Sequence, residues 1–304
     1  MKRTPRPDSS APPLGVGSPA LVAGQVDEPV RVAFKREHAL FSNHRYPQAL
    51  VLLTDLLARP DLTSRQRFEA LCRKADCLEH LQRPKAAVEL LREVTRAHRD
   101  EVLGFSLLGE YLYEVMDDCA GALRALRRAL RLNPKDPDSL WWRGQVYQLG
   151  LAKLALARKS YRAALESDPG YAPAMDSMAS VAEAEGKWIE AIDWRKNHYR
   201  RTRQAHDLVQ LAELYLRLGN VPAAQKYARQ ASKRAPGLAS GWLVLAKALA
   251  AGRRLAHGAE ALKRFTKLAH PRSGPFVYSR DFAWLEPLLD RPEVQALLPR
   301  IPKQ

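Results

Sequence analysis

The sequence predicts an all-α protein built from stacked helical hairpins. From residue 30 onward, apolar side chains recur at helical spacing, and β-branched residues are few. The pattern also repeats itself along the chain. Small alanines, each expected to open a second helix, recur every 33 to 38 residues, at Ala49, Ala87, Ala122, Ala157, Ala191, Ala224 and Ala259.

Prolines mark the ends of four of these units. Pro134, Pro169, Pro236 and Pro271 each follow a stretch of helical periodicity. Proline stops a helix because it lacks an N–H and its ring fixes φ. We therefore expect each of these units to end just before its proline.

The best-defined unit runs from Leu208 to Pro236. It reads Leu-x2-Leu-Ala-x2-Tyr-x3-Gly-x4-Ala-x3-Ala-x2-Ala-x4-Pro. This pattern resembles the tetratricopeptide repeat (TPR) family, whose unit is a helix–turn–helix of about 34 residues. Seven such units cover residues 30–271. The resemblance implies a right-handed TPR superhelix, an α-solenoid, and the richness in Ala, Leu and Arg suggests a bacterial protein.

Small residues explain how such a unit packs. Ala224 stands where the two helices of a hairpin cross, and a larger side chain would push them apart. Gly186 and Gly219 allow a left-handed turn between the helices. Two units, around Leu108 and Gly144, carry one extra residue near the turn, and the first two units lack a turn glycine.

The two ends of the chain read differently from the repeats. Residues 1–29 are broken by prolines and small polar residues, so we expect a flexible, uncleaved tail and no export signal. An open stack of hairpins needs a cap because its last apolar face is otherwise exposed. The apolar stripe between Phe276 and Leu298 predicts that residues 272–304 form a helical C-terminal cap.

Composition excludes several classes of protein. No stretch approaches the ~20 apolar residues that a membrane-spanning helix needs. Three cysteines cannot staple a chain of 304 residues, and their odd number favours a reducing, cytoplasmic compartment. The chain carries 49 Lys and Arg against 33 Asp and Glu, a formal net charge of +16.

No pattern in the sequence predicts catalysis. There is no His-Glu-x-x-His motif, and the eight histidines show no paired metal-ligand spacing. Cys72 and Cys77 are five residues apart, which places them on different faces of a helix. Gly186-Lys187 lacks the glycine-rich loop of a phosphate site. We predict a protein that is not an enzyme and holds no metal or cofactor.

Charge is divided between the first and second helices of the units. In the third to sixth units, the first helices carry thirteen acids and two bases (100–118, 136–149, 172–185, 205–218). The second helices carry eighteen bases and three acids (119–133, 151–167, 187–203, 220–235). In the TPR family the first helices line an inner groove, so the resemblance implies an acidic groove and a basic exterior.

The resemblance also implies which first-helix side chains face the groove. They include carboxylates and two aromatic residues, namely Asp76, Glu79, Glu110, Tyr113, Glu114, Asp138, Trp141, Asp176, Glu183 and Glu213. The extra residues in the third and fourth units leave the register there open by one position.

Adjacent helix residues point about 100° apart, so Trp141 and Trp142 cannot share one core stripe. Either one is in the core and the other lies against a neighbouring hairpin, or one anchors a partner in the groove.

Two interpretations of the acidic groove follow. In the first, the protein is a non-enzymatic scaffold or adaptor whose groove binds a Lys- or Arg-bearing segment of another protein. In the second, the acids only balance basic second helices through intramolecular ion pairs.

The basic exterior has its own alternatives. It can simply be solvated, or it can bind nucleic acid through counterion release, with Arg127, Arg128, Arg200 and Arg201 in contact. A third possibility is self-association through the first repeats, if Phe34 and Phe41 are exposed.

Overall fold

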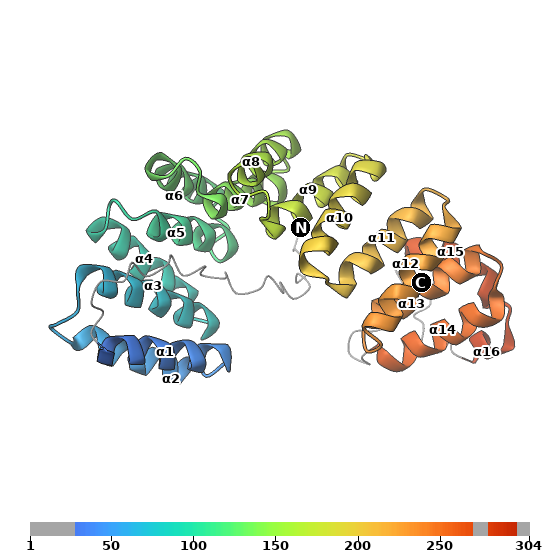
Figure 1. Cartoon of the computed structure of the whole chain (residues 1–304), viewed down its shortest axis with the longest axis horizontal. Helices are drawn as coiled ribbons and strands as arrows, with labels where there is room; N and C mark the ends of the chain where they lie inside the picture. Colours follow the sequence, from blue (N-terminus) through green and yellow to red (C-terminus); the bar gives the residue numbers. More distant parts are fainter. Residues whose placement is uncertain (1–27, 270–278, 297–304) are drawn as a thin grey trace. The chain divides into compact units, whose positions relative to one another are not determined.

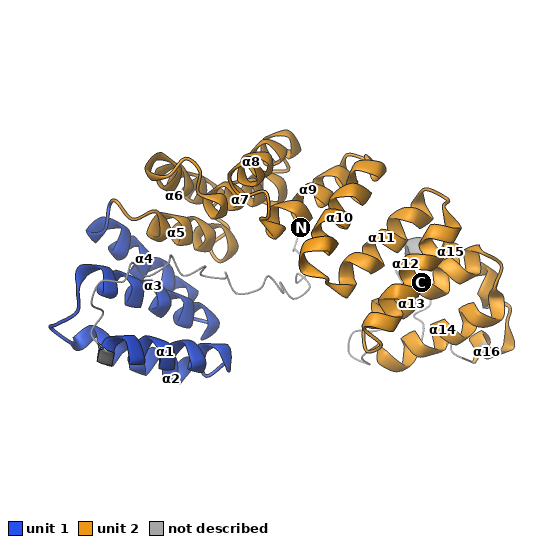
Figure 2. Ribbon diagram, viewed as in Figure 1, with its two compact units in different colours: residues 1–99 blue, residues 100–304 orange. Residues whose placement is uncertain are grey.

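The computed structural model describes residues 28–269 and 279–296, and these residues form α-helices joined by short turns (Figure 1). The predicted tail up to residue 27, Pro271 and the ends of the predicted cap lie outside the described residues. The chain divides into two compact units, residues 1–99 and 100–304 (Figure 2). Each unit is described by itself.

The described part of unit 1, from residue 28 onward, contains two helical hairpins. Their helices are α1 (Glu28–Ser42), α2 (Tyr46–Ala58), α3 (Ser64–His80) and α4 (Pro84–Ala97). The start of α3 is fixed by a capping box, in which Thr63 accepts from the backbone N–H of Gln66 and the Gln66 side chain accepts from that of Thr63. An apolar cluster that includes Ala49, Leu53 and Cys77 holds the unit together.

In its described residues, unit 2 contains five more hairpins and two closing helices. The hairpins are α5 (Val102–Glu114) with α6 (Cys119–Leu132), α7 (Pro137–Gln145) with α8 (Leu154–Ser167), α9 (Ala172–Ala184) with α10 (Trp188–Thr202), α11 (Ala205–Arg217) with α12 (Val221–Arg234), and α13 (Ala239–Ala251) with α14 (Leu255–Leu268).

The closing helices follow the last hairpin. They are α15 (Ser279–Leu289), which contacts α13 and α14, and α16 (Pro292–Gln295), which contacts α14. Leu285, Leu288 and Val294 are buried in the same apolar cluster as α13 and α14. These helices therefore cover the last hairpin.

The alanines that defined the sequence period are buried, as predicted. Six of the seven are fully inaccessible, and Ala259 is 2% exposed. A second small position, on the first helices, is equally tight: a Cβ added to Gly144 would lie 2.3 Å from the ring of Tyr161. Small side chains thus set the distance between the two helices of each hairpin.

The predicted helix ends are confirmed where they are described. Pro134, Pro169 and Pro236 each follow a second helix by two residues. The turn glycines Gly186 and Gly219 have φ values of +72° and +71°. In the other five hairpins a residue with a side chain takes the same left-handed conformation, namely His44, Gln82, Asp117, Ala152 and Arg253.

The extra residue of the fourth hairpin is taken up by a π-helix. After α7 the chain forms η1 (Val146–Gly150), in which Leu151 N–H donates to the carbonyl of Val146, five residues back. The third hairpin uses a related wide turn, with Met116 N–H donating to Tyr111. The insertion therefore widens the end of the first helix and leaves its beginning in the same register as in the other hairpins.

Candidate functional site

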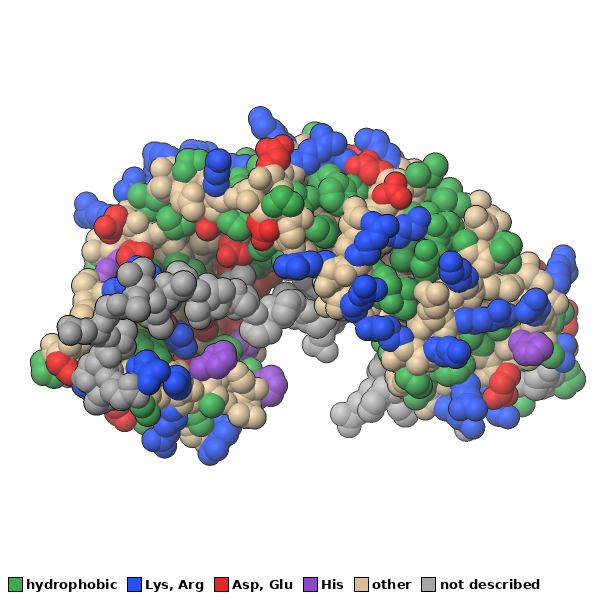
Figure 3. All heavy atoms as spheres, viewed as in Figure 1, with side chains coloured by type: hydrophobic (Ala, Val, Ile, Leu, Met, Phe, Trp, Pro, Cys, Tyr) green, Lys and Arg blue, Asp and Glu red, His purple; other side chains and the backbone are tan. Residues whose placement is uncertain are grey.

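The first helices of unit 2 carry most of the predicted groove residues, and several of these helices contact one another. Helix α5 contacts α7, α7 contacts α9, and α11 contacts α13. Carboxylates are visible beside α5 and α7 in Figure 3, and Lys and Arg side chains gather over α10 to α12. We call the accessible side chains of α5, α7, α9 and α11 the first-helix face.

On α5, the two predicted glutamates and the predicted tyrosine differ in exposure. Glu110 is half-buried and Glu114, at the end of the helix, is exposed. Tyr113 is only 2% exposed, so the prediction that it faces a groove is wrong. Its ring lies near Gly150, at the end of η1, because α5 packs against the following hairpin there.

On α7, both predicted residues contact the next hairpin. Asp138, in the first turn, accepts a hydrogen bond from the Tyr171 hydroxyl. Burial raises the pKa of Asp138, and this hydrogen bond opposes the shift. Trp141 is half-buried and its Nε1–H donates to Ser177 Oγ at 2.9 Å, whereas Trp142 is buried. Of the two interpretations of this pair, the structure favours the one in which Trp141 lies against a neighbouring hairpin.

On α9, the predicted acids share one cation. Arg195 of α10 forms ion pairs with both Asp176 and Glu183, and its Nη2 lies 3.2 Å from Glu183 Oε1. The arginine side chain is 3% exposed, but those of Asp176 and Glu183 are 48% and 35% exposed. A buried guanidinium therefore holds two carboxylates that remain accessible.

The same arrangement occurs one hairpin later. Glu213 of α11 pairs with Lys247 of α13 at 3.2 Å, and the lysine is 5% exposed while the glutamate is 45% exposed. Intramolecular neutralisation is thus real at three of the predicted acids. It leaves a net negative charge at the Arg195 cluster, where one cation faces two carboxylates.

A buried histidine–aspartate pair lies next to this cluster. His198 Nδ1 is 2.8 Å from Asp207 Oδ1, and both residues are buried. Thr202 Oγ1 donates to Asp207 as well, at 3.2 Å. Ligand atoms of Asp176, His198 and Asp207 lie within 4.8 Å of one another, close enough to hold a metal ion. The Arg195 guanidinium already contacts Asp176, so a positive charge occupies that place.

In unit 1 the predicted groove residues Asp76 and Glu79 are half-buried on α3, and Glu79 contacts His80 at 3.4 Å. Phe34 and Phe41, whose exposure would favour self-association through the first repeats, are both half-buried. Arg73 covers the ring of Phe34 at 5.0 Å. The Phe41 ring makes edge contacts with the rings of Tyr46 and His80.

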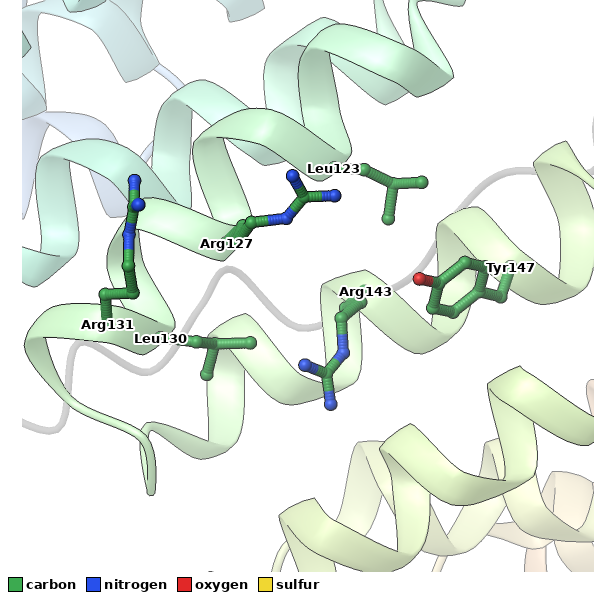
Figure 4. Close-up of a pocket in the computed structure, with 6 residues that line it drawn as sticks. All are labelled: Leu123, Arg127, Leu130, Arg131, Arg143 and Tyr147. Atoms are coloured by element: carbon green, nitrogen blue, oxygen red, sulfur yellow. The ribbon is translucent and has the colours of Figure 1, made fainter.

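The predicted basic residues lie on second helices. Arg127, Arg200 and Arg201 are exposed, and Arg128 is half-buried over the ring of Phe105. A pocket between α6 and α7 is lined by Leu123, Arg127, Leu130, Arg131, Arg143 and Tyr147 (Figure 4).

The three arginines of this pocket do not converge on one point. Arg131 and Arg143 extend in opposite directions (Figure 4), and Arg143 Nε donates to Ser160 Oγ at 3.1 Å. Burial lowers the pKa of Arg143, as expected for a cation without a carboxylate beside it.

Sequence reasoning missed the two cations that hold the exposed acids. Arg195 was counted as part of a basic exterior, and Lys247 lies in the seventh unit, outside the charge count. A signal was present. Glu213 and Lys247 are 34 residues apart, about one repeat, as are Asp138 and Tyr171 at 33. Charges or hydrogen-bonding groups one period apart, on first helices or just before them, are expected to meet when hairpins stack.

The stacked hairpins, the buried small residues and the left-handed turns define a repeat protein of the α-solenoid class. The family model for the tetratricopeptide repeat matches residues 38–101, 111–172 and 209–271, more than half of the chain. The chain therefore belongs to the tetratricopeptide repeat family. Proteins built from this repeat are generally non-enzymatic scaffolds for protein–protein interaction.

Several solved structures share this fold. PilW, described as a widely conserved type IV pilus biogenesis factor, is similar with a TM-score of 0.61 and 20% identity, over 72% of this chain and 100% of PilW. The C-terminal part of a TPR protein from Cytophaga hutchinsonii is similar with a TM-score of 0.57 and 14% identity, over 83% of this chain and 99% of that one.

A TPR protein from Parabacteroides merdae is similar with a TM-score of 0.55 and 14% identity, over 86% and 99% of the two chains. No curated protein sequence matches the chain. Among the helices of the described residues, none has the length and apolarity needed to cross a bilayer.

Proposed function

We propose that the protein is a non-enzymatic adaptor whose first-helix face binds a Lys- or Arg-bearing segment of another protein. The observation that carries the proposal is the asymmetry of the Arg195 cluster. The cation is buried, while its two carboxylates stay about a third to a half exposed. The carboxylates are therefore held in fixed positions and can still accept hydrogen bonds from a partner.

Preorganisation of this kind favours binding. A carboxylate that is already held loses little conformational entropy when a second cation pairs with it. Two acids facing one arginine also leave an attractive negative charge, which accelerates the association of a basic partner. Glu110 and Glu114 on α5 extend the acidic surface, and Trp141 adds a half-buried indole beside it on α7.

The hairpin with this cluster departs from the family pattern. The matched regions leave out residues 173–208, which include most of α9 and all of α10. Arg203 stands there in place of the expected proline and takes a left-handed conformation with φ of +58°. We infer that α9 and α10 give the chain its particular specificity.

A pull-down with charge-reversal variants tests the proposal. Glu110→Lys with Glu114→Lys reverses two acids of the first-helix face, one half-buried and one exposed. Glu166→Lys with Asp193→Lys makes the same charge change at exposed residues of the second helices α8 and α10. We expect proteins bound by the wild type and the second variant to be lost from the first. Recovery of the same proteins with the wild type and both variants would reject binding at the first-helix face.

We also assign the protein to the cytoplasm, a reducing compartment. Cys72, Cys77 and Cys119, all within the described residues, form no disulfide bond, and Cys72 and Cys77 are buried in unit 1. Trapping of thiols in intact cells tests this assignment, since a disulfide-bonded form in the native cell would contradict it.

An alternative function uses the basic second helices. In the described residues no ion pair is formed by Arg127, Arg131 or Arg143, which line the pocket between α6 and α7. Because their side chains diverge, an extended polyanion such as RNA suits them better than one small anion. RNA binding should then fall steeply with salt and with Arg127→Glu, Arg200→Glu and Arg201→Glu.

A further inference from the structure

The turns that join the two helices of the hairpins from α7–α8 to α13–α14 lie along one edge. Arg158 of α8 pairs with Glu185, in the turn between α9 and α10, at 2.6 Å. Arg217, at the end of α11, lies over the ring of Trp188, at the start of α10, with 5.2 Å between the guanidinium carbon and the ring centroid. The turns of successive hairpins are therefore neighbours.

Exposed aliphatic side chains stand on this edge. Ile189 is 71% exposed, Leu156 is 42% exposed and Leu218 is 41% exposed. Leu151 is exposed as well, and it occupies the same place as Leu218, three residues before the second helix begins. Three successive hairpins thus each present at least one aliphatic side chain to solvent.

Cations accompany these side chains. We define the turn edge as the four aliphatic residues together with five exposed basic residues, namely Lys153, Lys187, Arg217, Arg253 and Arg254.

The acids at the turn between α9 and α10 are already engaged. Glu185 pairs with Arg158 and Lys187, and Glu190 pairs with Arg158. The turn edge is therefore both apolar and positively charged.

We propose that the turn edge binds an anionic membrane surface. Aliphatic side chains on protruding turns can enter the boundary between headgroups and acyl chains without needing a shaped pocket. Lysine and arginine near the bilayer add attraction to anionic lipids, which acts over about a Debye length. The half-buried indole of Trp188 on the same edge suits the interfacial region.

An acidic protein is the competing occupant. Protein interfaces draw most of their binding energy from aromatic and arginine side chains seated in well-packed pockets. The turn edge instead presents leucine and isoleucine side chains that are 37–71% exposed. These observations favour a lipid surface, which adapts to the shape of the protein.

Vesicle co-sedimentation of the full chain tests the proposal. The probes are vesicles of phosphatidylcholine alone and of phosphatidylcholine mixed with phosphatidylglycerol. We expect binding only to the anionic vesicles, weakened by salt. Ile189→Ser with Leu218→Ser leaves the charge unchanged and should weaken binding roughly tenfold or more, because two inserting side chains are lost.

Matched variants separate insertion from simple charge attraction. Leu103→Ser with Leu268→Ser removes two leucines that are 40% and 41% exposed on other surfaces, and this variant should bind like the wild type. Lys153→Glu with Arg253→Glu and Arg254→Glu should abolish binding. The same number of reversals at Arg127, Arg200 and Arg201 on the second helices should weaken it much less. All exchanged residues are exposed, and circular dichroism verifies folding.

Three outcomes overturn the proposal. The first is no binding to anionic vesicles by the wild type. The second is equal loss of binding in the two sets of charge reversals, since a general basic surface would then be responsible. The third is binding of polyglutamate, but not of vesicles, that depends on Ile189 and Leu218. That result would assign the turn edge to an acidic protein.

Discussion

Arg195 of α10 and Glu183 of α9 form an ion pair in which the two sides have opposite environments. The arginine side chain is 3% exposed and the glutamate 35% exposed, with 3.2 Å between Nη2 and Oε1. Asp176 completes the cluster from the same helix as Glu183. Without the carboxylates the arginine would be a buried unpaired charge, whereas without the arginine the carboxylates would still be in contact with water.

This asymmetry predicts unequal effects of removing either side. Asp176→Asn with Glu183→Gln leaves a buried guanidinium without a counter-charge and should lower the free energy of unfolding by about 3 kcal/mol. Arg195→Met fills the space with an apolar chain and frees two carboxylates to solvent. It should cost only about 1 kcal/mol. Urea denaturation measures both values.

Glu166→Gln with Asp193→Asn serves as the control for that comparison, because both residues are exposed on second helices. Its effect should stay within about 0.5 kcal/mol. An Arg195→Met variant less stable than the double carboxylate variant would show that packing, not charge, dominates the cluster.

The turns between helices predict opposite effects of exchanging glycine and alanine. Gly219 has φ of +71° and an added Cβ would meet no atom within 4 Å, so Gly219→Ala should cost about 1 kcal/mol through backbone strain alone. Ala152 adopts φ of +53°, and Ala152→Gly should gain up to about 1 kcal/mol. Thermal unfolding of both variants measures the changes.

Ala155→Gly is the control for the turn prediction. Ala155 is exposed in the first turn of α8, where glycine should destabilise the helix by up to about 1 kcal/mol. If Ala152→Gly lowered the melting temperature as Ala155→Gly does, relief of backbone strain would not be the governing effect.

The burial of Asp138 predicts that its replacement by asparagine stabilises the protein, by an amount that depends on pH. Its pKa is raised above the ordinary value of 3.8 because burial disfavours the charged form. The folded protein then binds this proton more tightly than the unfolded chain, and stability falls as pH rises from 3.8 through the folded pKa. Asp138→Asn should therefore stabilise the protein at pH 7 and keep the acceptor for Tyr171.

The gain from Asp138→Asn should vanish below pH 3.8, where the wild-type carboxyl is protonated in both states. Glu190 provides the opposite case. The hydrogen bond from Arg158 lowers its pKa, so Glu190→Gln should lose stability at pH 7 and little in acid. Urea denaturation at pH 7 and below pH 3.8 measures the stability of both variants. An equal gain from Asp138→Asn in acid would contradict the stated cause.

The thiols predict a clear order of reactivity. Burial raises the pKa of Cys77 to about 12, with the charges of Glu37 and Asp76 adding to the shift. Cys72 is also buried, whereas Cys119 is half-buried at the start of α6. At pH 8 a thiol reagent should modify Cys119 first and Cys77 last. Mass spectrometry of partly modified protein identifies the order, and early labelling of Cys77 would contradict it.

Much of the fold could be predicted from the sequence because its determinants are local. The alanine period located the crossing of each helix pair, and prolines located helix ends, since both effects act within a few residues. The six left-handed residues other than glycine in the described part of the chain escaped prediction. At Ala152, for example, the hairpin geometry imposes a conformation that the residue itself does not favour.

The candidate site was predictable only in outline. The position of each acid in the repeat located it on a first helix. Whether that acid is paired depended on which cation lies next to it when the hairpins stack. Tyr113 illustrates the limit, because the extra residue at the end of α5 and the packing of the next hairpin decided its burial. Nothing within α5 itself distinguishes a buried tyrosine at that position from an exposed one.

The sequence by itself determined that this chain is a row of two-helix units with small residues at each crossing, because periodicity and steric size operate along one helix. Only the tertiary structure decided which charges are buried and which remain available. Arg195 and Asp176 are 19 residues apart, and Lys247 and Glu213 are 34 apart. Their pairing depends on how helices pack, and packing is settled by side chains from several helices together.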